Sequence, residues 1–336
     1  MNQETQRRTL RVYGCGGCGV NIGALLEPLR DSQDPCCADI DTAYIDTSRS
    51  NTKHHPIADE NVYLVDNVDG SGKIRKENHR EIAARTKDIL QKFPTGDVNI
   101  VVHSLSGGSG SVIGPSIVSE ILDRKEIAIV LGVGSADTVI DTKNTLNSIK
   151  SYEGIIDVRG LPVTMIYEQN SRANKREVVD AKMRAAIVSL AVLWSGNNLE
   201  MDSKDLFNFL NFHIPTSFRP QLAHLSLIGP DEAPTFGTNT NVISVATLAT
   251  KGQDVTLELD GKIPEVQYTG YLPEEANDKL KSSVPTHFII TDGIFEDVGG
   301  LLNSTLKTVE GQQQARVQKD RLLTDADQPT STGLVL

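Results

Sequence analysis

The stretch Gly14-Cys15-Gly16-Gly17-Cys18-Gly19-Val20-Asn21 comes directly after a short apolar segment at residues 10–13. Glycines allow a tight backbone turn and leave N–H groups open to an anion, and a helix that follows adds its positive end. The stretch therefore predicts a strand, a phosphate-binding loop and a helix from residue 21. The alternative is a glycine-rich turn that only connects the strand to the helix.

A second glycine loop, Ser106-Gly107-Gly108-Ser109-Gly110-Ser111, follows the apolar, β-branched segment at residues 98–103. The hydroxyl groups of Ser109 and Ser111 can donate hydrogen bonds to phosphate oxygens. Two such loops suit a nucleoside triphosphate that is clamped from both sides. We expect a third contact from Gly70-Ser71-Gly72-Lys73, which lacks the spacing of a P-loop.

The first loop also fits the dinucleotide fingerprint G-x-G-x-x-G through Gly14, Gly16 and Gly19. Asp46, at the end of the next expected strand, is placed to hold a ribose. The motif therefore leaves an NAD-dependent oxidoreductase open as an alternative. The second glycine loop favours a triphosphate instead, because a dinucleotide site does not need it.

Expected strands alternate with helices along the first half of the chain, which predicts an α/β fold with a Rossmann-like parallel sheet. Both glycine loops then lie at the carboxyl edge of the sheet, where such folds bind ligands. Residues 176–195 predict a long helix whose apolar second half is typical of a buried strut. Strands expected at 241–250, 254–259 and 287–291 indicate a smaller α/β C-terminal domain.

These elements divide the chain into four parts. We expect a nucleotide-binding domain at residues 8–173, a central helix at 174–197, a C-terminal domain at 198–310 and a flexible tail at 311–336. The tail is expected to be flexible because it is polar and rich in Gln, Asp, Thr and Ser.

The 336-residue chain has a net charge of -11, which argues against nucleic-acid binding by the chain as a whole. We expect a cytoplasmic protein with no membrane segment, because no apolar run approaches the ~18 residues of a membrane helix. The four cysteines, including the adjacent Cys36 and Cys37, fit a reducing compartment. Cys15 and Cys18 have the C-x-x-C spacing of zinc and redox sites, but no second ligand pair completes a zinc site, so we expect no metal site of this kind.

The two glycine loops resemble the nucleotide loops of the tubulin/FtsZ family. Residues 14–21 look like the first loop of the family. Residues 107–112 are similar to its signature G-G-T-G-[ST]-G, with Ser109 in place of Thr and Val112 in place of the last glycine.

Further segments match the family in order and spacing. The Asp46-Thr47-Ser48 turn falls where the second loop of the family lies, and Gly70-Ser71-Gly72 falls where its γ-phosphate-sensing loop lies. Asn170 ends a segment similar to the one whose Asn contacts the guanine base. The helix at 176–195 resembles the central helix, with Ala186 where the family usually has a base-contacting Asn.

The resemblance implies a GTPase that binds GTP/GDP with Mg²⁺ and polymerises with itself, head to tail. Residues 200–206 are similar to the synergy loop, whose acids complete the active site of the next subunit, with Glu200 in place of the first Asn. This implies Asp202 and Asp205 as catalytic residues, with Asp205 preferred. The alternative is that both acids cap the start of a helix, where Asp is common.

Family members of this size are encoded by phages and plasmids, which implies filaments that position phage or plasmid DNA. The C-terminal tail lacks the peptide by which bacterial division relatives bind membrane adaptors, and it would instead bind a DNA-binding adaptor or neighbouring filaments. A structural filament protein that assembles without hydrolysis is a further alternative. A phage-encoded protein would act in the cytoplasm of the bacterial host.

Overall fold

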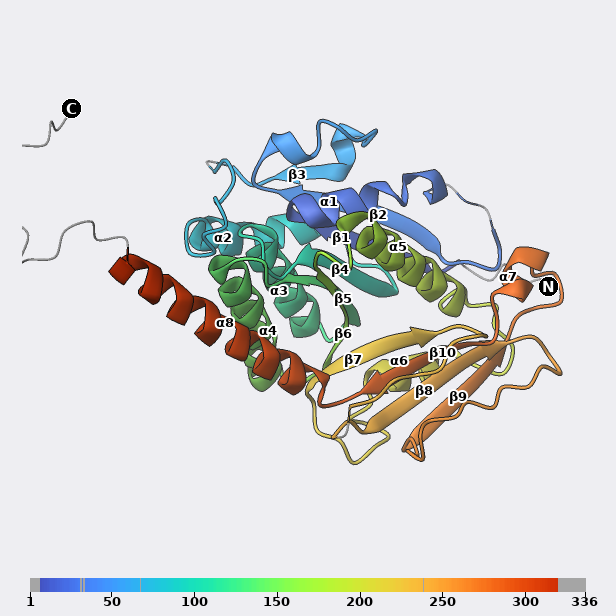
Figure 1. The fold of residues 1–336 in the computed structure, drawn as a ribbon. Coiled ribbons are helices and arrows are strands. Elements are labelled where there is room, and N and C mark those ends of the chain that lie inside the picture. The colour runs from blue at the N-terminus through green and yellow to red at the C-terminus, as the bar shows by residue number, and fades with distance from the viewer. Residues whose placement is uncertain (1–6, 31, 33, 67, 238, 320–336) are drawn as a thin grey trace, which may run out of the picture.

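The computed structural model describes residues 7–319, except 31, 33, 67 and 238. Its strands are β1 (Thr9–Cys15), β2 (Asp39–Asp46), β3 (Val62–Leu64), β4 (Val98–Ser104), β5 (Ala128–Ser135), β6 (Val163–Asn170), β7 (Leu222–Ile228), β8 (Val242–Ala249), β9 (Val266–Tyr271) and β10 (Thr286–Thr291). Within the described residues these strands form one sheet, in the order β3-β2-β1-β4-β5-β6-β7-β10-β8-β9 (Figure 1).

Eight α-helices are present in the same part of the chain. They are α1 (Gly16–Ala24), α2 (His79–Lys92), α3 (Gly110–Asp123), α4 (Val139–Arg159), α5 (Arg176–Leu193), α6 (Ser203–Leu210), α7 (Asp278–Ser282) and α8 (Ile294–Lys319). None of these helices combines the length and apolar character that a membrane span needs.

The strands from β3 to β7 in this order are parallel to one another and are covered on both faces. Alternate residues of β1 point to opposite faces, so Leu10 and Val12 join the core with α1 and α5, whereas Tyr13 and Cys15 join the core with α2, α3, α4 and α8. This arrangement confirms the predicted α/β fold. It also places the ends of β1 and β4 next to the starts of α1 and α3.

The C-terminal part continues the same sheet with mixed strand directions. β10 is antiparallel to both of its neighbours, β7 and β8, and β9 is parallel to β8. The strand predicted at 254–259 is wrong for the described structure. Leu257 and Leu259 instead pack on a small cluster that includes Val242 and Ile289, which explains the alternating pattern without strand pairing.

Helix α5 runs between the two parts, as the apolar pattern predicted. Its 18 residues span roughly 27 Å at the usual rise of an α-helix. Near its C-terminal end the carbonyl of Ala191 accepts a hydrogen bond of 2.8 Å from the N–H of Ala38, just before β2. The helix therefore ends at the amino edge of the parallel strands.

Three of the described helices were not predicted, and one prediction needs its boundary moved. Sequence reasoning missed α4, α7 and α8, and α8 continues to Lys319, into the stretch expected to be a tail. Residues 320–336 lie outside the described residues. Helix α1 begins at Gly16, inside the glycine loop rather than after it, because Gly16 makes the turn with φ +67°.

Candidate functional site

A cavity of about 210 Å³ lies at the carboxyl ends of β1, β2 and β4. Its walls come from the two glycine loops, the turn after β2 and the third loop. The lining residues are Cys15, Gly16, Gly17, Cys18, Asp46, Ser48, Asn51, Gly70, Ser71, Ser104, Gly107, Gly108, Ser109 and Gly110. Segments far apart in the sequence thus meet in one hollow, and Ser48, Asn51 and Ser104 join the site residues that the sequence indicated.

The two glycine loops touch each other through their backbones. A Cβ atom at Gly16 would lie 2.8 Å from the nitrogen of Gly110, and one at Gly110 would lie 2.6 Å from the carbonyl oxygen of Cys15. These distances leave no room for a side chain. The same closeness holds further back, where a Cβ at Gly14 would lie 2.6 Å from the oxygen of Gly19, so Gly14 packs strand against helix rather than lining the cavity.

Helices α1 and α3 both begin at this cavity, at Gly16 and Gly110, and neither has an acidic residue in its first turn. The first N–H groups of a helix have no partner within the helix, and the helix dipole favours negative charge there. Two such ends facing one hollow make a site for an anion with several oxygen atoms, such as a chain of phosphates.

Hydroxyl groups join three of the loops. The Oγ1 atom of Thr47 lies 2.6 Å from the Oγ of Ser109, which donates to the Oγ of Ser71 at 3.2 Å. A Cβ at Gly108 would overlap the Ser71 side chain. The third loop therefore rests directly on the second glycine loop, although Gly72 itself has open space around it.

Asp46 stabilises the turn after β2 through hydrogen bonds. Its side chain is buried, its Oδ1 accepts from the N–H of Thr47 at 2.7 Å, and its Oδ2 accepts from the Nδ2 of Asn51 at 2.7 Å. Burial raises the pKa of this carboxyl, and the hydrogen bonds oppose that rise. Asp46 therefore holds the turn after β2 through both of its oxygens.

Cys15 and Cys18 are free thiols on opposite faces of the sheet. Burial raises the pKa of Cys15 well above its ordinary value and that of Cys18 to about 12. Such thiols stay protonated and are poor nucleophiles or metal ligands. The described residues contain no cluster of three His, Cys, Asp or Glu side chains able to hold a metal ion.

Besides Gly14 and Gly72, four residues that the sequence indicated for nucleotide binding do not line the cavity. Asn21 pairs with the Nε2 of His55 at 2.8 Å, and Ser106 is buried with its Oγ 3.0 Å from that of Ser104. The hydroxyl of Ser111 donates to the carbonyl of Gly107 at 2.6 Å, so it is not available to a phosphate. Asn170 ends β6, outside the hollow.

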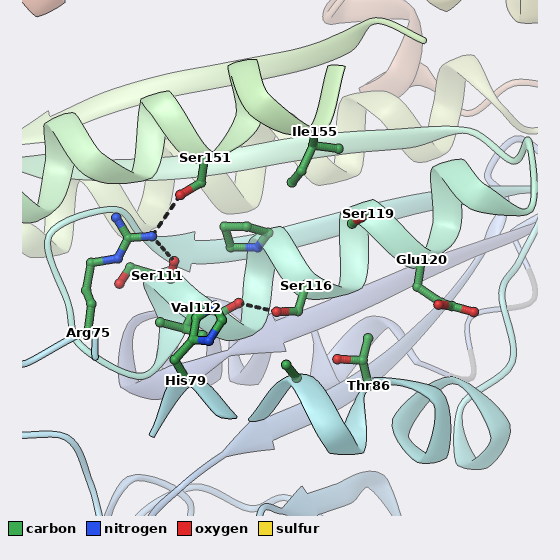
Figure 2. Close-up of a pocket in the computed structure, with 12 residues that line it drawn as sticks. Arg75, His79, Thr86, Ser111, Val112, Ser116, Ser119, Glu120, Ser151 and Ile155 are labelled. Atoms are coloured by element: carbon green, nitrogen blue, oxygen red, sulfur yellow. Dashed lines mark hydrogen bonds between the residues drawn. The ribbon is translucent and has the colours of Figure 1, made fainter. Parts of the chain in front are cut away.

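Ser111 borders a different hollow, of about 350 Å³, between α2, α3 and α4 (Figure 2). There its carbonyl accepts from the Nη2 of Arg75 at 3.1 Å, and the same nitrogen donates to the Oγ of Ser151 at 3.0 Å. Ser111 thus separates this hollow from the cavity at the strand ends.

Two polar side chains outside the cavity have an unused acceptor. The Oδ1 atoms of Asn170 and Asp180 are buried and have no hydrogen-bond partner in the described part of the chain. Asp180, on α5, lies close enough to Cys18 for its charge to add to the rise in the pKa of that thiol, and burial raises the pKa of Asp180 itself. Sequence reasoning placed Ala186 at the base-contacting position and did not single out Asp180, which lies in the charged first half of α5.

Asp202 and Asp205 form a reciprocal capping box at the start of α6. The Oδ1 of Asp202 accepts from the N–H of Asp205 at 3.0 Å, and the Oδ2 of Asp205 accepts from the N–H of Asp202 at 3.0 Å. The Oδ1 of Asp202 and the Oδ2 of Asp205 therefore cap the helix, as one of the two interpretations of these acids expected. The Oδ1 of Asp205 has no hydrogen-bond partner among the described residues.

These acids lie at the opposite edge of the sheet from the cavity. Arg8, which directly precedes β1, donates a hydrogen bond to the Oγ of Ser203, the residue between the two parts of the capping box. The cavity begins at Cys15, at the other end of β1, which is roughly 20 Å away for a strand of 7 residues. Within one chain, the acids and the cavity cannot meet.

Fold and site together define a tubulin-like protein. A protofilament structure of TubZ from bacteriophage PhiKZ superposes with a TM-score of 0.78 at 29% identity, over 97% of this chain and 99% of that one. The structure of the phage tubulin PhuZ with GDP gives a TM-score of 0.79 at 20% identity, also over 97% and 99%.

The sequence comparison gives the family. The chain is 30% identical to a phage tubulin-like protein of Pseudomonas phage phiKZ over 97% of this chain and 97% of that protein, and 28% identical to one of Pseudomonas phage PhiPA3. No protein-family model matches the sequence. The chain belongs to the phage tubulin-like proteins of the tubulin/FtsZ superfamily, as its loops indicated, and this membership argues against the oxidoreductase alternative.

Proposed function

We propose that this protein binds GTP in the cavity at the strand ends, polymerises head to tail and hydrolyses GTP at each junction. The observation that carries the proposal is that the cavity and the acids of α6 lie at opposite edges of the sheet. Two subunits stacked end to end bring these halves together, and such a contact repeats without closing, which generates a filament. Relatives described as a protofilament and as GDP-bound support this reading.

In this proposal each part of the chain has one task. Residues 8–173 hold the nucleotide, the segment at 174–197 transmits between the two ends, and residues 198–310 present the acids to the next subunit. The phosphates would accept hydrogen bonds from the backbone N–H groups at the starts of α1 and α3. The hydroxyl of Ser109 would have to leave Ser71 in order to donate to them as well.

Mg²⁺ would be held mainly by the phosphates, because this ion needs only one or two protein carboxylates and keeps several waters. The residues fit such a role: Asp69 is exposed beside the lining residue Gly70, and its Oδ1 accepts from the Oγ of Ser48 at 2.8 Å. When bound, the ion would neutralise charge on the phosphates.

Asp205 would act on the water that attacks the terminal phosphate of the neighbouring subunit. Its Oδ2 holds the capping box, which fixes the side chain, while its Oδ1 remains open. A carboxylate fixed in this way can orient the water and accept its proton. Asp202 would add negative charge beside it and cap the helix.

One alternative agrees equally well with the geometry of the acids. Because both acids are engaged in the capping box, a filament protein that assembles without hydrolysis would show the same local geometry. Phosphate release by filaments of the wild type separates the two possibilities, as described below.

We infer that the cellular role is to position phage or plasmid DNA in the host cytoplasm. A DNA-binding adaptor or neighbouring filaments would bind the C-terminal tail, of which residues 320–336 are outside the described residues. Helix α8, which packs along α4, leads to this segment (Figure 1).

Guanine selectivity tests the nucleotide proposal. Guanine offers two N–H donor groups on one edge, which match the carboxylate of Asp180, whose Oδ1 has no hydrogen-bond partner among the described residues and whose Oδ2 lies 3.7 Å from the Nε of Arg176. Xanthine has a carbonyl in place of one donor. We expect the wild type to pellet as filaments with GTP and not with ATP or xanthosine triphosphate. In Asp180→Asn, the amide supplies a donor for the xanthine carbonyl, so the preference should shift from GTP to xanthosine triphosphate by roughly tenfold or more. Sedimentation of both proteins with each nucleotide measures this shift.

Pelleting of the wild type to the same extent with every nucleotide, or with none, would contradict the nucleotide proposal. If the wild type requires GTP but Asp180→Asn keeps that preference unchanged, only the role of Asp180 is wrong.

A further inference from the structure

The hollow between α2, α3 and α4 contains a positive charge that no acid of the described chain balances (Figure 2). The guanidinium of Arg75 is partly buried there, and its Nη2 atom donates to the carbonyl of Ser111 and to the hydroxyl of Ser151. Its Nε and Nη1 atoms donate to no described residue, and no described carboxylate forms an ion pair with it. A guanidinium has five N–H donors, so three of them remain for a ligand.

The surroundings of this arginine add to the positive potential. Burial lowers the pKa of Arg75, but an arginine side chain stays protonated in proteins. Helix α2 begins at His79, which lines the same end of the hollow, and no side chain caps this helix start. Glu81, the acid in the first turn of α2, is exposed and does not line the hollow. The positive end of the helix dipole therefore reinforces the charge of Arg75.

The far side of the hollow carries groups that suit hydroxyls. Figure 2 shows Ser116, Ser119 and Glu120 along α3, with Glu120 far from the arginine. The hydroxyl of Ser116 donates to the carbonyl of Val112 at 2.8 Å, so its oxygen can still accept a hydrogen bond. The Oγ of Ser119 accepts from the Nη2 of Arg159 at 3.3 Å, so its O–H can still donate. Donors and acceptors together match hydroxyl groups, which do both.

Ser111 forms the wall between this hollow and the cavity at the strand ends. Its carbonyl accepts from Arg75, and its hydroxyl donates to the carbonyl of Gly107 at 2.6 Å and to that of Gly108 at 3.0 Å. Gly107 and Gly108 both line the cavity. One residue therefore connects the arginine of the hollow to the loop expected to hold phosphates.

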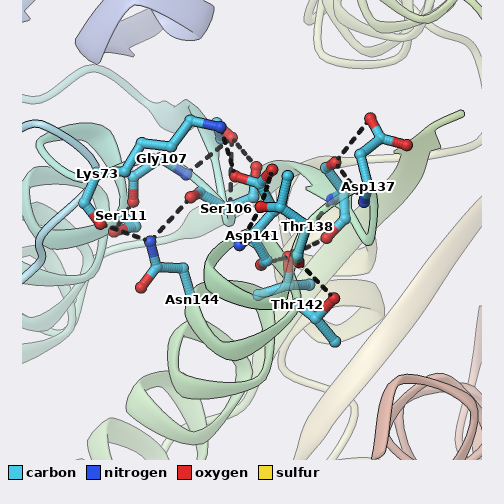
Figure 3. Close-up of polar contacts among 12 residues, drawn as sticks. Lys73, Ser106, Gly107, Ser111, Asp137, Thr138, Asp141, Thr142 and Asn144 are labelled. Atoms are coloured by element: carbon cyan, nitrogen blue, oxygen red, sulfur yellow. Dashed lines mark hydrogen bonds and ion pairs between the residues drawn. The ribbon is translucent and has the colours of Figure 1, made fainter. Parts of the chain in front are cut away.

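Helix α4 fastens the loops on the cavity side (Figure 3). The Nδ2 of Asn144 donates to the carbonyl of Lys73 in the third loop at 2.8 Å and to that of Ser106 in the second glycine loop at 3.0 Å. The Nζ of Lys73 also donates to the Oδ1 of Asp141 at 2.7 Å. Because Ser151 lies on the same helix and borders the hollow, the hollow and both loops share one support.

We propose that this hollow is a regulatory site for a small organic anion that carries hydroxyl groups. The anionic group pairs with Arg75, and the hydroxyl groups bind the polar side chains along α3. A bound anion fixes Arg75 and, through Ser111, the second glycine loop, so it strengthens nucleotide binding. This last effect rests on the proposed function, because it needs a nucleotide in the cavity.

Charge and size select this class of ligand. Hydrogen bonds between a guanidinium and an oxyanion are among the strong ones, and phosphates and carboxylates both provide them. A neutral or cationic ligand would leave the charge of Arg75 unbalanced in a partly buried place, which costs free energy. A volume of about 350 Å³ lies at the small end of ligand pockets, which favours a compact molecule.

Calorimetry on the GDP-loaded protein, below the assembly concentration, tests the site with three probes. They are glycerol 3-phosphate, glycerate as its carboxylate counterpart, and glycerol as the uncharged control. We expect at least one of the two anions to bind with a Kd of ~1 mM or lower, and glycerol not to bind. Binding of glycerol 3-phosphate alone would identify a phosphate ester as the ligand, and binding of glycerate alone would identify a carboxylate.

Two variants remove the site in different ways. Arg75→Met removes the charge and should weaken binding of the anion by about tenfold or more, the effect of losing hydrogen bonds to a charged group. Ala83→Phe keeps the charge but fills the hollow from α2, where Ala83 is an exposed lining residue, and should weaken binding to a similar extent. Arg80→Met and Ala84→Phe are the matched controls, because both residues are exposed on α2 and do not line the hollow. Both controls should bind the anion as the wild type does.

The proposal is wrong if neither anion binds to the wild type, or if Arg75→Met and Ala83→Phe keep the wild-type affinity for the anion. The regulatory part has its own readout. A saturating concentration of the anion should raise the affinity for GDP about fivefold in the wild type and leave it unchanged in Ala83→Phe. An unchanged GDP affinity in the wild type would overturn the regulatory role. Failure of the wild type to bind GDP at all would instead overturn the proposed function, and the same variants would then test the anion site on the nucleotide-free protein.

Discussion

Asp205→Asn is expected to lower GTP hydrolysis by ~100-fold or more while filaments still form, since positioned acid–base groups contribute rate factors of that order. The asparagine keeps an oxygen that can accept from the N–H of Asp202, so the cap of α6 survives and only the charge is lost. Phosphate release and sedimentation, measured on the same sample with GTP and Mg²⁺, test both halves of this expectation.

Two controls separate chemistry from capping. Asp205→Ala removes the charge together with the hydrogen bond of the capping box, so it should add a stability loss of about 1 kcal/mol to the same loss of turnover. Asp202→Ser keeps a good capping residue and is expected to retain the stability of the wild type. Normal turnover in Asp205→Asn would show that this carboxylate is only a helix cap. Wild-type filaments that release no phosphate would instead favour the structural filament protein.

Gly16→Ala is expected to abolish useful nucleotide binding. The new methyl group would lie 2.8 Å from the backbone of Gly110, and the residue would keep a positive φ that alanine tolerates poorly. The two glycine loops must then separate, and a displacement of ~1 Å in such a site can cost on the order of 100-fold. We expect the affinity for GDP to fall by about that factor and stability to fall by roughly 2–4 kcal/mol. Calorimetry with GDP and denaturant titration measure these two effects.

Gly154→Ala is the matched control, because a Cβ at this exposed position of α4 meets nothing within 4 Å. Alanine is the better helix former, so stability should rise by up to about 1 kcal/mol with GDP affinity unchanged. An affinity in Gly16→Ala equal to that of the wild type would mean that contact between the two loops does not shape the binding site.

The glycine loops could be read from the sequence because their requirement is local. Gly16 needs a positive φ, and Gly110 needs room for another backbone, so each position tolerates little else. The strands that precede them are short apolar runs with a clear pattern. Local patterns of this kind are enough to predict both the fold class and the place of the cavity.

Helix α4 could not be read in the same way because its polar face points inward. The hydroxyl of Thr145 donates to the carbonyl of Ser135 at 3.0 Å, and that of Ser148 donates to the carbonyl of Leu105 at 2.7 Å. Polar side chains that suggest an exposed loop are therefore buried in this helix. No apolar stripe of helical period marks the segment. The ion pair of Lys73 with Asp141 could not be predicted either, because the two residues lie far apart in the sequence.

Capping and catalysis also look alike in a sequence. An Asp three residues after another Asp fits a helix start equally well with either function, and the structure shows that the capping bonds are made. The structure also shows where the acids lie. The contact of Ser203 with Arg8 puts them at the amino end of β1, away from the cavity. That separation required the folded chain.

Completion of one active site by two subunits is tested most directly by phosphate release from GTP over a range of protein concentrations, with light scattering recorded in parallel. We expect the rate per subunit to rise above a threshold concentration, at the point where scattering also rises. A rate per subunit that stays constant across that threshold would show that one chain carries the whole site and would contradict the shared active site.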